Sequence, residues 1–160
     1  MKTRLLIFIV LLTSCFSACE KQKTMVDIGV QICYADKNGK DMLDPNTPNA
    51  YKESDIDLYY MIDGVKTRVY DGMRDTPENF MFYYLETFHM YSLSIGPNDR
   101  YDANQMSETL IDFGDRVDTL TVSFAVSANS MIVRSVWYNH VLKAEEIHSL
   151  RTPFIITVDR

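Results

Sequence analysis

Residues 117–126 alternate apolar side chains with small or polar ones. A period of two is the spacing of a β-strand that buries one face. The apolar members of the strand, which share that face, are Leu120, Val122, Phe124 and Val126. A polar stretch at 127–130 separates this strand from a second candidate at 131–138. The pattern predicts an antiparallel sheet with a core on one side.

The rest of the chain repeats this pattern in shorter pieces. Strand candidates lie at 24–35, 55–60, 65–70, 80–95, 109–113, 141–143 and 154–158, and we expect 80–95 to break into two near Glu86. Turn residues such as Asp63-Gly64 separate them. About eight short strands with regularly spaced turns predict an all-β, antiparallel β-sandwich, with a closed barrel as the rival fold. One helical turn is expected at 144–150.

The N-terminus has the layout of a secretory signal. Lys2 and Arg4 precede an apolar run at 5–12 that is too short to span a bilayer, and small residues follow. Residues 12–15 (Leu-Thr-Ser-Cys) and 16–19 (Phe-Ser-Ala-Cys) both fit a bacterial lipobox, in which the cysteine is lipidated and becomes the new N-terminus. Cys19 is favoured because polar residues follow it directly. Cys15 is the alternative because Leu12 is the better upstream residue.

The composition of the remaining chain limits its partners. Without 1–18 the chain keeps 14 basic residues (16 less Lys2 and Arg4) against 22 acidic ones, a net charge of 14 − 22 = −8. No basic run remains, which argues against nucleic acid and against electrostatic binding to lipid. We therefore expect membrane attachment to depend on the acyl chains. We expect a short tether at 19–23 and one domain at 24–160. Cys33 has no evident disulfide partner and is expected to be a buried apolar residue.

Two groups of residues are candidates for ligand binding. The oxygen donors Asp36, Asn38, Asp41 and Asp44 cluster in one loop and suggest calcium, although Lys40 and Gly39 break the EF-hand order. The alternative is that these side chains close local turns. Aromatic residues suggest a platform that stacks on sugar rings, and neighbouring pairs must send one ring to each face of a sheet. The candidates are Tyr59, Tyr60, Tyr83, Tyr84 and Trp137, from a wider aromatic set that also includes Tyr91 and Tyr138. Aromatic packing in the core is the alternative.

Catalytic motifs are absent from the sequence. The histidines His89, His140 and His148 have neither metal-ligand nor nucleophile-base spacing. Pairs of carboxylates such as Asp55 and Asp57 occur, but an acidic chain produces them by chance. A glycoside hydrolase would also need a cleft between two carboxylates. We therefore assign no catalytic residues.

Several short motifs together resemble a known group of proteins. They are the lipobox, residues 36–45 (Asp-Lys-Asn-Gly-Lys-Asp-Met-Leu-Asp-Pro), Phe113-Gly114 followed by 118–120 (Asp-Thr-Leu), and 137–139 (Trp-Tyr-Asn). In this order the chain resembles the small envelope lipoproteins of Bacteroidetes-type bacteria, many of them of unknown function. The resemblance implies an immunoglobulin-like sandwich tethered to the outer membrane of a Gram-negative cell. It implies no catalytic residues.

These observations predict a membrane-anchored, extracytoplasmic lipoprotein. Its expected role is a non-catalytic module that binds an envelope protein or a glycan. One alternative is a structural or accessory domain without a ligand of its own. The other is a glycan hydrolase that uses carboxylates. No cofactor is expected, apart from the calcium that the loop at 36–44 suggests.

Overall fold

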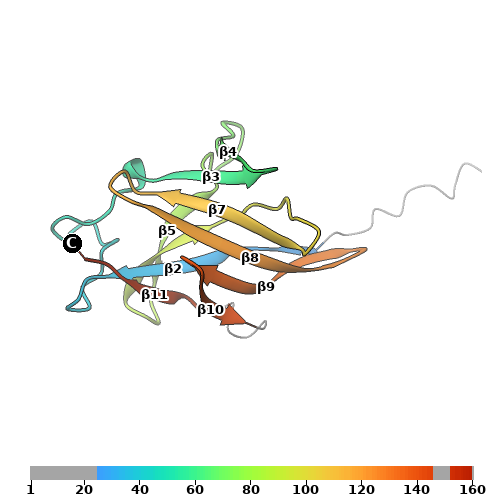
Figure 1. Ribbon diagram of the computed structural model, residues 1–160. Helices are drawn as coiled ribbons and strands as arrows, with labels where there is room; N and C mark the ends of the chain where they lie inside the picture. The colour runs from blue at the N-terminus through green and yellow to red at the C-terminus, as the bar shows by residue number, and fades with distance from the viewer. Residues whose placement is uncertain (1–24, 146–151, 160) are drawn as a thin grey trace, which may run out of the picture.

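The computed structural model of the protein describes residues 25–145 and 152–159 (Figure 1). Within these ranges the fold is nearly all β, with one short 3-10 turn, η2 (Glu53–Asp55), and no α-helix. None of the described helical residues forms a segment long and apolar enough to cross a bilayer. The proposed signal at 1–18, the tether at 19–23 and both candidate lipidation sites, Cys15 and Cys19, lie outside the described residues.

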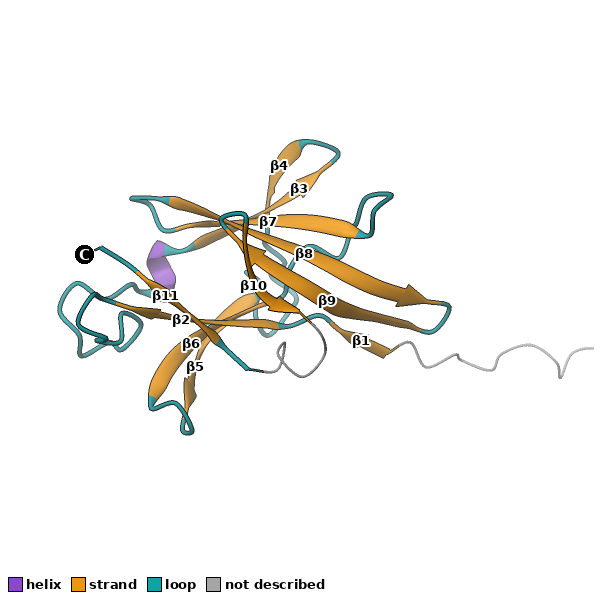
Figure 2. Cartoon of the chain, turned by 60° about the horizontal axis from the view of Figure 1, so that its bottom comes forward, coloured by secondary structure: helices purple, strands orange, loops and turns teal. Residues whose placement is uncertain are grey.

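The strands form two separate sheets. The seven-stranded sheet has the order β1 (Met25–Asp27), β9 (Ser130–Tyr138), β8 (Val117–Ser127), β7 (Met106–Asp112), β3 (Asp57–Ile62) and β4 (Val65–Arg68), and β10 (Val141–Glu145) also pairs with β9. The four-stranded sheet has the order β11 (Phe154–Thr157), β2 (Val30–Ala35), β6 (Met90–Ile95) and β5 (Phe80–Leu85). Figure 2 shows the two sheets as separate layers.

The alternation at 117–126 produces the strand that it predicts. Leu120, Val122 and Phe124 on β8 are each at most 1% exposed, and they join Ile32 of β2 and Leu93 of β6 in one core cluster. The core therefore lies between the two sheets. Burial of apolar area at about 25 cal/mol per Å² makes this layer the main source of stability.

Two details of the sequence prediction are wrong. The sheets are mixed rather than antiparallel, because β1 pairs with β9 and β11 pairs with β2 in parallel. The described part has eleven strands rather than about eight. One reason is that 24–35 divides at Ile28 and Gly29, so that β1 joins the large sheet and β2 the small one. Parallel neighbours need long connections, and both parallel pairs involve the first or last described strand.

The local turn predictions are confirmed. β3 and β4 form a hairpin across Asp63-Gly64, where both residues have positive φ, and β5 and β6 form a hairpin across 86–89. Asn139 and His140 turn β9 into β10, again with positive φ. The helical turn expected at 144–150 is wrong at its start, because Ala144 and Glu145 belong to β10. Residues 146–150 lie outside the described residues.

A chain of buried hydroxyl groups joins the two sheets. The hydroxyls of Tyr34 on β2 and Tyr138 on β9 lie 2.9 Å apart, and Tyr138 donates to Asp118 Oδ2 at 2.6 Å. Burial raises the pKa of both tyrosines above the usual range, so both hydroxyls stay protonated. Asn139 Nδ2 donates to the other oxygen of Asp118. The core of this protein thus carries a specific polar contact that fixes how the sheets pack.

Candidate functional site

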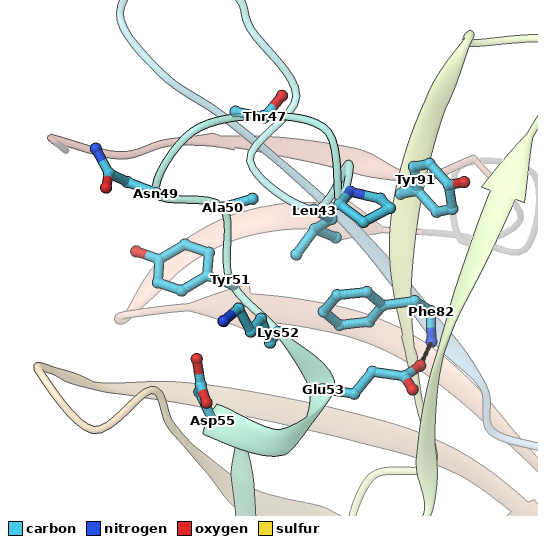
Figure 3. Close-up of a pocket in the computed structure, with 11 residues that line it drawn as sticks. Leu43, Thr47, Asn49, Ala50, Tyr51, Lys52, Glu53, Asp55, Phe82 and Tyr91 are labelled. Carbon is cyan, nitrogen blue, oxygen red and sulfur yellow. Dashed lines mark hydrogen bonds between the residues drawn. The ribbon is translucent and has the colours of Figure 1, made fainter.

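A groove of about 920 Å³ lies between the loop that follows β2 and the β5–β6 hairpin (Figure 3). Its loop side runs from Leu43 to Asp55, and its sheet side consists of Phe82 on β5 and Tyr91 on β6. The lining residues are Leu43, Pro45, Thr47, Asn49, Ala50, Tyr51, Lys52, Glu53, Asp55, Phe82 and Tyr91. A groove of this size accommodates several sugar units or a short stretch of peptide.

The loop holds its shape through turns that its own side chains close. Asp36 Oδ1 accepts hydrogen bonds from the amides of Asn38 and Lys40, and Asp44 Oδ1 accepts one from Asn46. Asn49 has a φ of 60°, which asparagine tolerates better than most residues. The loop therefore forms a fixed wall for the groove even though it has no regular strand.

Tyr51 connects this wall to the core. It is only 3% exposed, and its ring centroid lies 4.6 Å from that of Phe113. The guanidinium of Arg116 lies over both rings, with its central carbon 5.3 Å from the Tyr51 centroid and 4.7 Å from the Phe113 centroid. Such contacts are favourable because a cation is attracted to the face of an aromatic ring. Nη2 of the same guanidinium is 2.9 Å from Asp118 Oδ2, an ion pair whose angle does not make a hydrogen bond.

The sheet side of the groove continues the core face of the β5–β6 hairpin. In this register Phe82 lies opposite Leu93 and Tyr84 opposite Tyr91, so these four side chains share one face. Leu93 is fully buried, but Tyr84 is 38% exposed. The rings of Tyr84 and Tyr91 pack edge to face with centroids 5.1 Å apart. The aromatic ladder therefore runs from the core outward along the groove.

Two carboxylates fasten the loop to the hairpin. Glu53 Oε1 accepts a hydrogen bond from the backbone amide of Phe82 at 2.6 Å, which Figure 3 shows as a dashed line. Asp41 Oδ2 accepts one from the amide of Tyr91 at 2.7 Å, and Asp41 Oδ1 accepts one from Leu43. The bonds to Phe82 and Tyr91 join residues far apart in sequence, and they hold the loop at the hairpin.

The charged groups of the groove lie on one wall. Lys52, Glu53 and Asp55 are neighbours on or next to η2 (Figure 3). The described lining residues offer no carboxylate on the opposite wall, which is formed by Phe82 and Tyr91. The groove thus combines aromatic rings from the hairpin with charged side chains that start from η2 and its neighbour Lys52.

The five predicted aromatic ligands are dispersed. None of the five lines the groove, although Tyr84 packs against Tyr91, which does. Tyr83 points to the opposite face of the small sheet, and the hydroxyl of Tyr60 donates to the carbonyl of Gly96. Tyr59 lies on the outer face of the large sheet beneath Lys66 Nζ, which is 3.8 Å from its ring centroid. Trp137 also lies on the large sheet, opposite Thr121.

The predicted calcium ligands Asp36, Asn38, Asp41 and Asp44 lie in one loop, but each carboxylate accepts main-chain hydrogen bonds. The amide of Lys40, followed by the amide and side chain of Asn38, lowers the pKa of Asp36. Within the described ranges, no three histidine, cysteine or acidic residues converge in a way that would hold a metal ion. The turn-closing alternative accounts for the local hydrogen bonds of Asp36, Asp41 and Asp44, whereas the bond from Tyr91 to Asp41 joins the loop to the hairpin.

Cys33 and two histidines also have structural positions. Cys33 is fully buried, and that burial, followed by the charge of Asp41, raises the pKa of its thiol from 9.0 to about 11. His89 and His140 occupy turn positions with positive φ. His148 lies outside the described residues.

Sequence reasoning missed most of the groove. Tyr51, Glu53 and Phe82 were not candidates, because loop residues and strand residues showed no common pattern. Tyr91 was considered only within the wider aromatic set, and Asp55 only as one of a pair of carboxylates. One signal was available. A hairpin across 86–89 places Tyr84 opposite Tyr91 and Phe82 on the same face, so its register alone would have identified the aromatic side.

The chain matches no known family model, and no curated protein or solved structure shows significant similarity to it.

Proposed function

We propose that this protein is a non-catalytic binding module of the cell envelope and that the groove is its ligand site. One observation supports this most strongly. The rings of Phe82 and Tyr91 and the polar turn at Glu53 and Asp55 line one open groove of about 920 Å³. Aromatic rings combined with a few polar groups are typical of ligand-binding pockets. The ligand is an envelope protein or a glycan.

The proposed location rests on the sequence. The basic, apolar and small residues of 1–18 support export, and the cysteine that ends each candidate lipobox supports lipidation at Cys19, with Cys15 as the alternative. Two acyl signals on one cysteine would hold the chain stably at a membrane. The resemblance to Bacteroidetes-type lipoproteins supports the outer membrane of a Gram-negative cell.

The proposed fold class is an immunoglobulin-like β-sandwich. Two features support it. The two sheets enclose one core, and the first strand region switches from the large sheet at β1 to the small sheet at β2. Chain segments that pass from one sheet to the other form the corners of some packed-sheet folds.

The hydrolase alternative has less support. Glycoside hydrolases place two carboxyl groups on either side of the scissile bond. Here Glu53 and Asp55 come from the same turn, and each has a hydrogen-bonding neighbour, Phe82 N and Ser54 Oγ respectively. This arrangement supports binding more than acid-base chemistry.

Metabolic labelling with an alkyne-tagged fatty acid tests the anchor. We expect the label on the wild-type chain and on one of the two variants Cys15→Ala and Cys19→Ala, and its loss from the other. Label on neither the wild type nor any variant would remove the lipoprotein assignment. Cys33→Ala is the matched control, because that thiol is buried in the domain.

Two screens with the full chain test the groove: a glycan array and a displayed library of random linear peptides. We expect binding in one of them, and we expect Phe82→Ala and Tyr91→Ala to weaken it by at least about tenfold. Tyr59→Ala is the control, because Tyr59 lies on the outer face of the other sheet. Binding that is insensitive to both groove variants contradicts the proposal, and no binding in either screen favours the structural-domain alternative.

A further inference from the structure

The four-stranded sheet ends on β5, which differs from the other edge strands in length. β5 has 6 residues, whereas β1 has 3, β4 and β11 have 4 each, and β10 has 5. An edge strand presents unpaired main-chain groups along its whole length. The free edge of β5 is therefore the longest such surface in the described part of the chain.

β5 also lacks the usual protection of an edge. Its sequence, Phe-Met-Phe-Tyr-Tyr-Leu, contains no charged residue and no proline. β4 carries Lys66 and Arg68, and β10 carries Lys143 and Glu145, which discourage pairing with another chain. β11 is uncharged too, but it is shorter. The sequence of β5 is thus the one that most favours a further strand.

The free main-chain groups of β5 can be assigned from its hydrogen bonds. The amide of Phe82 bonds to Glu53 rather than to β6, so it points away from β6. Main-chain groups alternate sides along an antiparallel pair, so the amide and carbonyl of Tyr84 point the same way. The Glu53 carboxylate, which comes from outside the strand, occupies this edge at Phe82.

Exposed apolar side chains flank the same edge. Met81, Tyr83 and Tyr84 are 43%, 56% and 38% exposed. Met81 and Tyr83 lie on the outer face of the small sheet, and Tyr84 lies on the groove face. Figure 2 shows the β5–β6 hairpin projecting from the body of the molecule. A strand added to β5 would cover apolar surface on both faces of the hairpin.

We propose that the groove binds an extended, basic segment of another protein, which adds to the small sheet as a strand beside β5. This inference rests on the proposed function and names the ligand class of that site. Main-chain hydrogen bonds to Phe82 and Tyr84 supply affinity, and every second side chain of the segment enters the groove. Phe82 can pair only when Glu53 releases its amide.

Charge complementarity is the reason that we infer a basic segment. Pairing frees the Glu53 carboxylate beside Asp55 in the groove, and a lysine or arginine of the incoming strand neutralises it. The whole chain has a net charge of −6, which attracts a basic partner and disfavours the approach of a second copy. A glycan would use the aromatic rings but would leave the edge of β5 unpaired.

The test uses the full chain, purified in detergent, and a displayed library of random linear nonapeptides. We expect enrichment of sequences that alternate apolar residues and contain lysine or arginine. Tyr84→Pro removes one outward-pointing amide and no bond to β6, whereas Tyr84→Val keeps the amide and serves as its control. The most enriched peptide should bind Tyr84→Pro at least about tenfold more weakly than Tyr84→Val.

A second measurement does not depend on the folding of a variant. The same peptide can be made with methyl groups on every second main-chain nitrogen, in two versions that differ by one residue. One of the two versions should lose binding to the wild-type chain, because its methyl groups lie on the nitrogens that would pair with β5. Glu53→Gln should weaken the binding of the lysine-containing peptide and not that of its norleucine analogue.

Three outcomes overturn the inference. The first is no enriched peptide, and the second is enriched peptides that bind Tyr84→Pro and Tyr84→Val equally. In both cases glycan-array binding that depends on Phe82 would leave the proposed function standing. The third is dimerisation in sedimentation experiments that Tyr84→Pro abolishes, which would identify a second copy as the occupant of β5. If neither screen gives binding, the proposed function fails as well.

Discussion

The Glu53 carboxylate and the Phe82 amide, 29 residues apart in sequence, are joined by a 2.6 Å hydrogen bond across one end of the groove. The contact has two consequences. It fixes the distance between η2 and β5, and it occupies one outward-pointing donor of an otherwise unprotected edge strand.

Replacing Glu53 with alanine should free that donor at small cost. We expect the amide of Phe82 to exchange its hydrogen faster, and the free energy of unfolding to fall by about 0.5–1 kcal/mol, because the bond is exposed to solvent. Hydrogen exchange measured by NMR checks the first expectation and urea unfolding the second. Asp55→Ala is the control, and equal exchange rates at Phe82 in both variants would contradict the role of Glu53.

Asp41 should matter more than the neighbouring acidic residues of its loop. Asp41→Ala removes the acceptor of two amides, those of Leu43 and Tyr91, and we expect a loss of about 1–3 kcal/mol in urea unfolding. Asp44→Ala should cost less, because Asp44 bonds only within its own turn, to Asn46. Calorimetry with calcium on the same variants tests the metal prediction. Heat in the wild type that is lost in Asp41→Ala would support a calcium site.

Gly96 is expected to tolerate no side chain. A Cβ at this position would lie 2.7 Å from Cγ of Asn79, whose side chain donates to the Gly96 carbonyl and to the hydroxyl of Tyr60. We expect Gly96→Ala to lower the melting temperature, with a cost of about 1–3 kcal/mol. Gly29→Ala is the matched control, since a Cβ there meets nothing within 4 Å. Equal melting temperatures for the two variants would contradict this account.

The hydroxyl of Tyr138 should contribute to stability through both of its partners. Tyr138→Phe leaves the buried Tyr34 hydroxyl without its neighbour and removes a donor to Asp118. We expect urea unfolding to show a loss of about 1–3 kcal/mol. Tyr59→Phe, on the outer face, should change stability little. A neutral Tyr138→Phe would mean that the hydroxyl chain does not help to fix the sheets.

Cys33 should make stability depend on pH in the alkaline range. Its pKa is raised from 9.0 to about 11, so the folded state holds the thiol proton more tightly than the unfolded state does. The stability that the protonated thiol contributes is therefore complete below pH 9 and is lost as the pH rises through 11. The urea midpoint of the wild type should fall more steeply between these values than that of Cys33→Ala, in which the tyrosines titrate equally. Parallel plots of urea midpoint against pH for the two chains would contradict the raised pKa of Cys33.

Sequence patterns predicted the parts of this fold that depend on near neighbours. The alternation at 117–126, the break inside 80–95 and the Asp63-Gly64 hairpin are all properties of a few consecutive residues, and the structure has each of them. The parallel pairing of β1 and β11 depends on contacts between distant segments, which no local pattern encodes. The groove was missed for the same reason, because Tyr51 reads as a loop residue until Phe113 and Arg116 are packed against it.

β1 and the loop that lines the groove lie at opposite ends of the molecule (Figure 1). Met25 pairs with Ser130 at the tip of the β8–β9 hairpin, while the loop that lines the groove leaves β2 at Ala35, toward the opposite end of the molecule (Figure 1). If the chain is held at a surface by its N-terminus, the length of the domain acts as a spacer. The loop that lines the groove would then lie away from that surface, where a partner can reach it without first approaching the membrane.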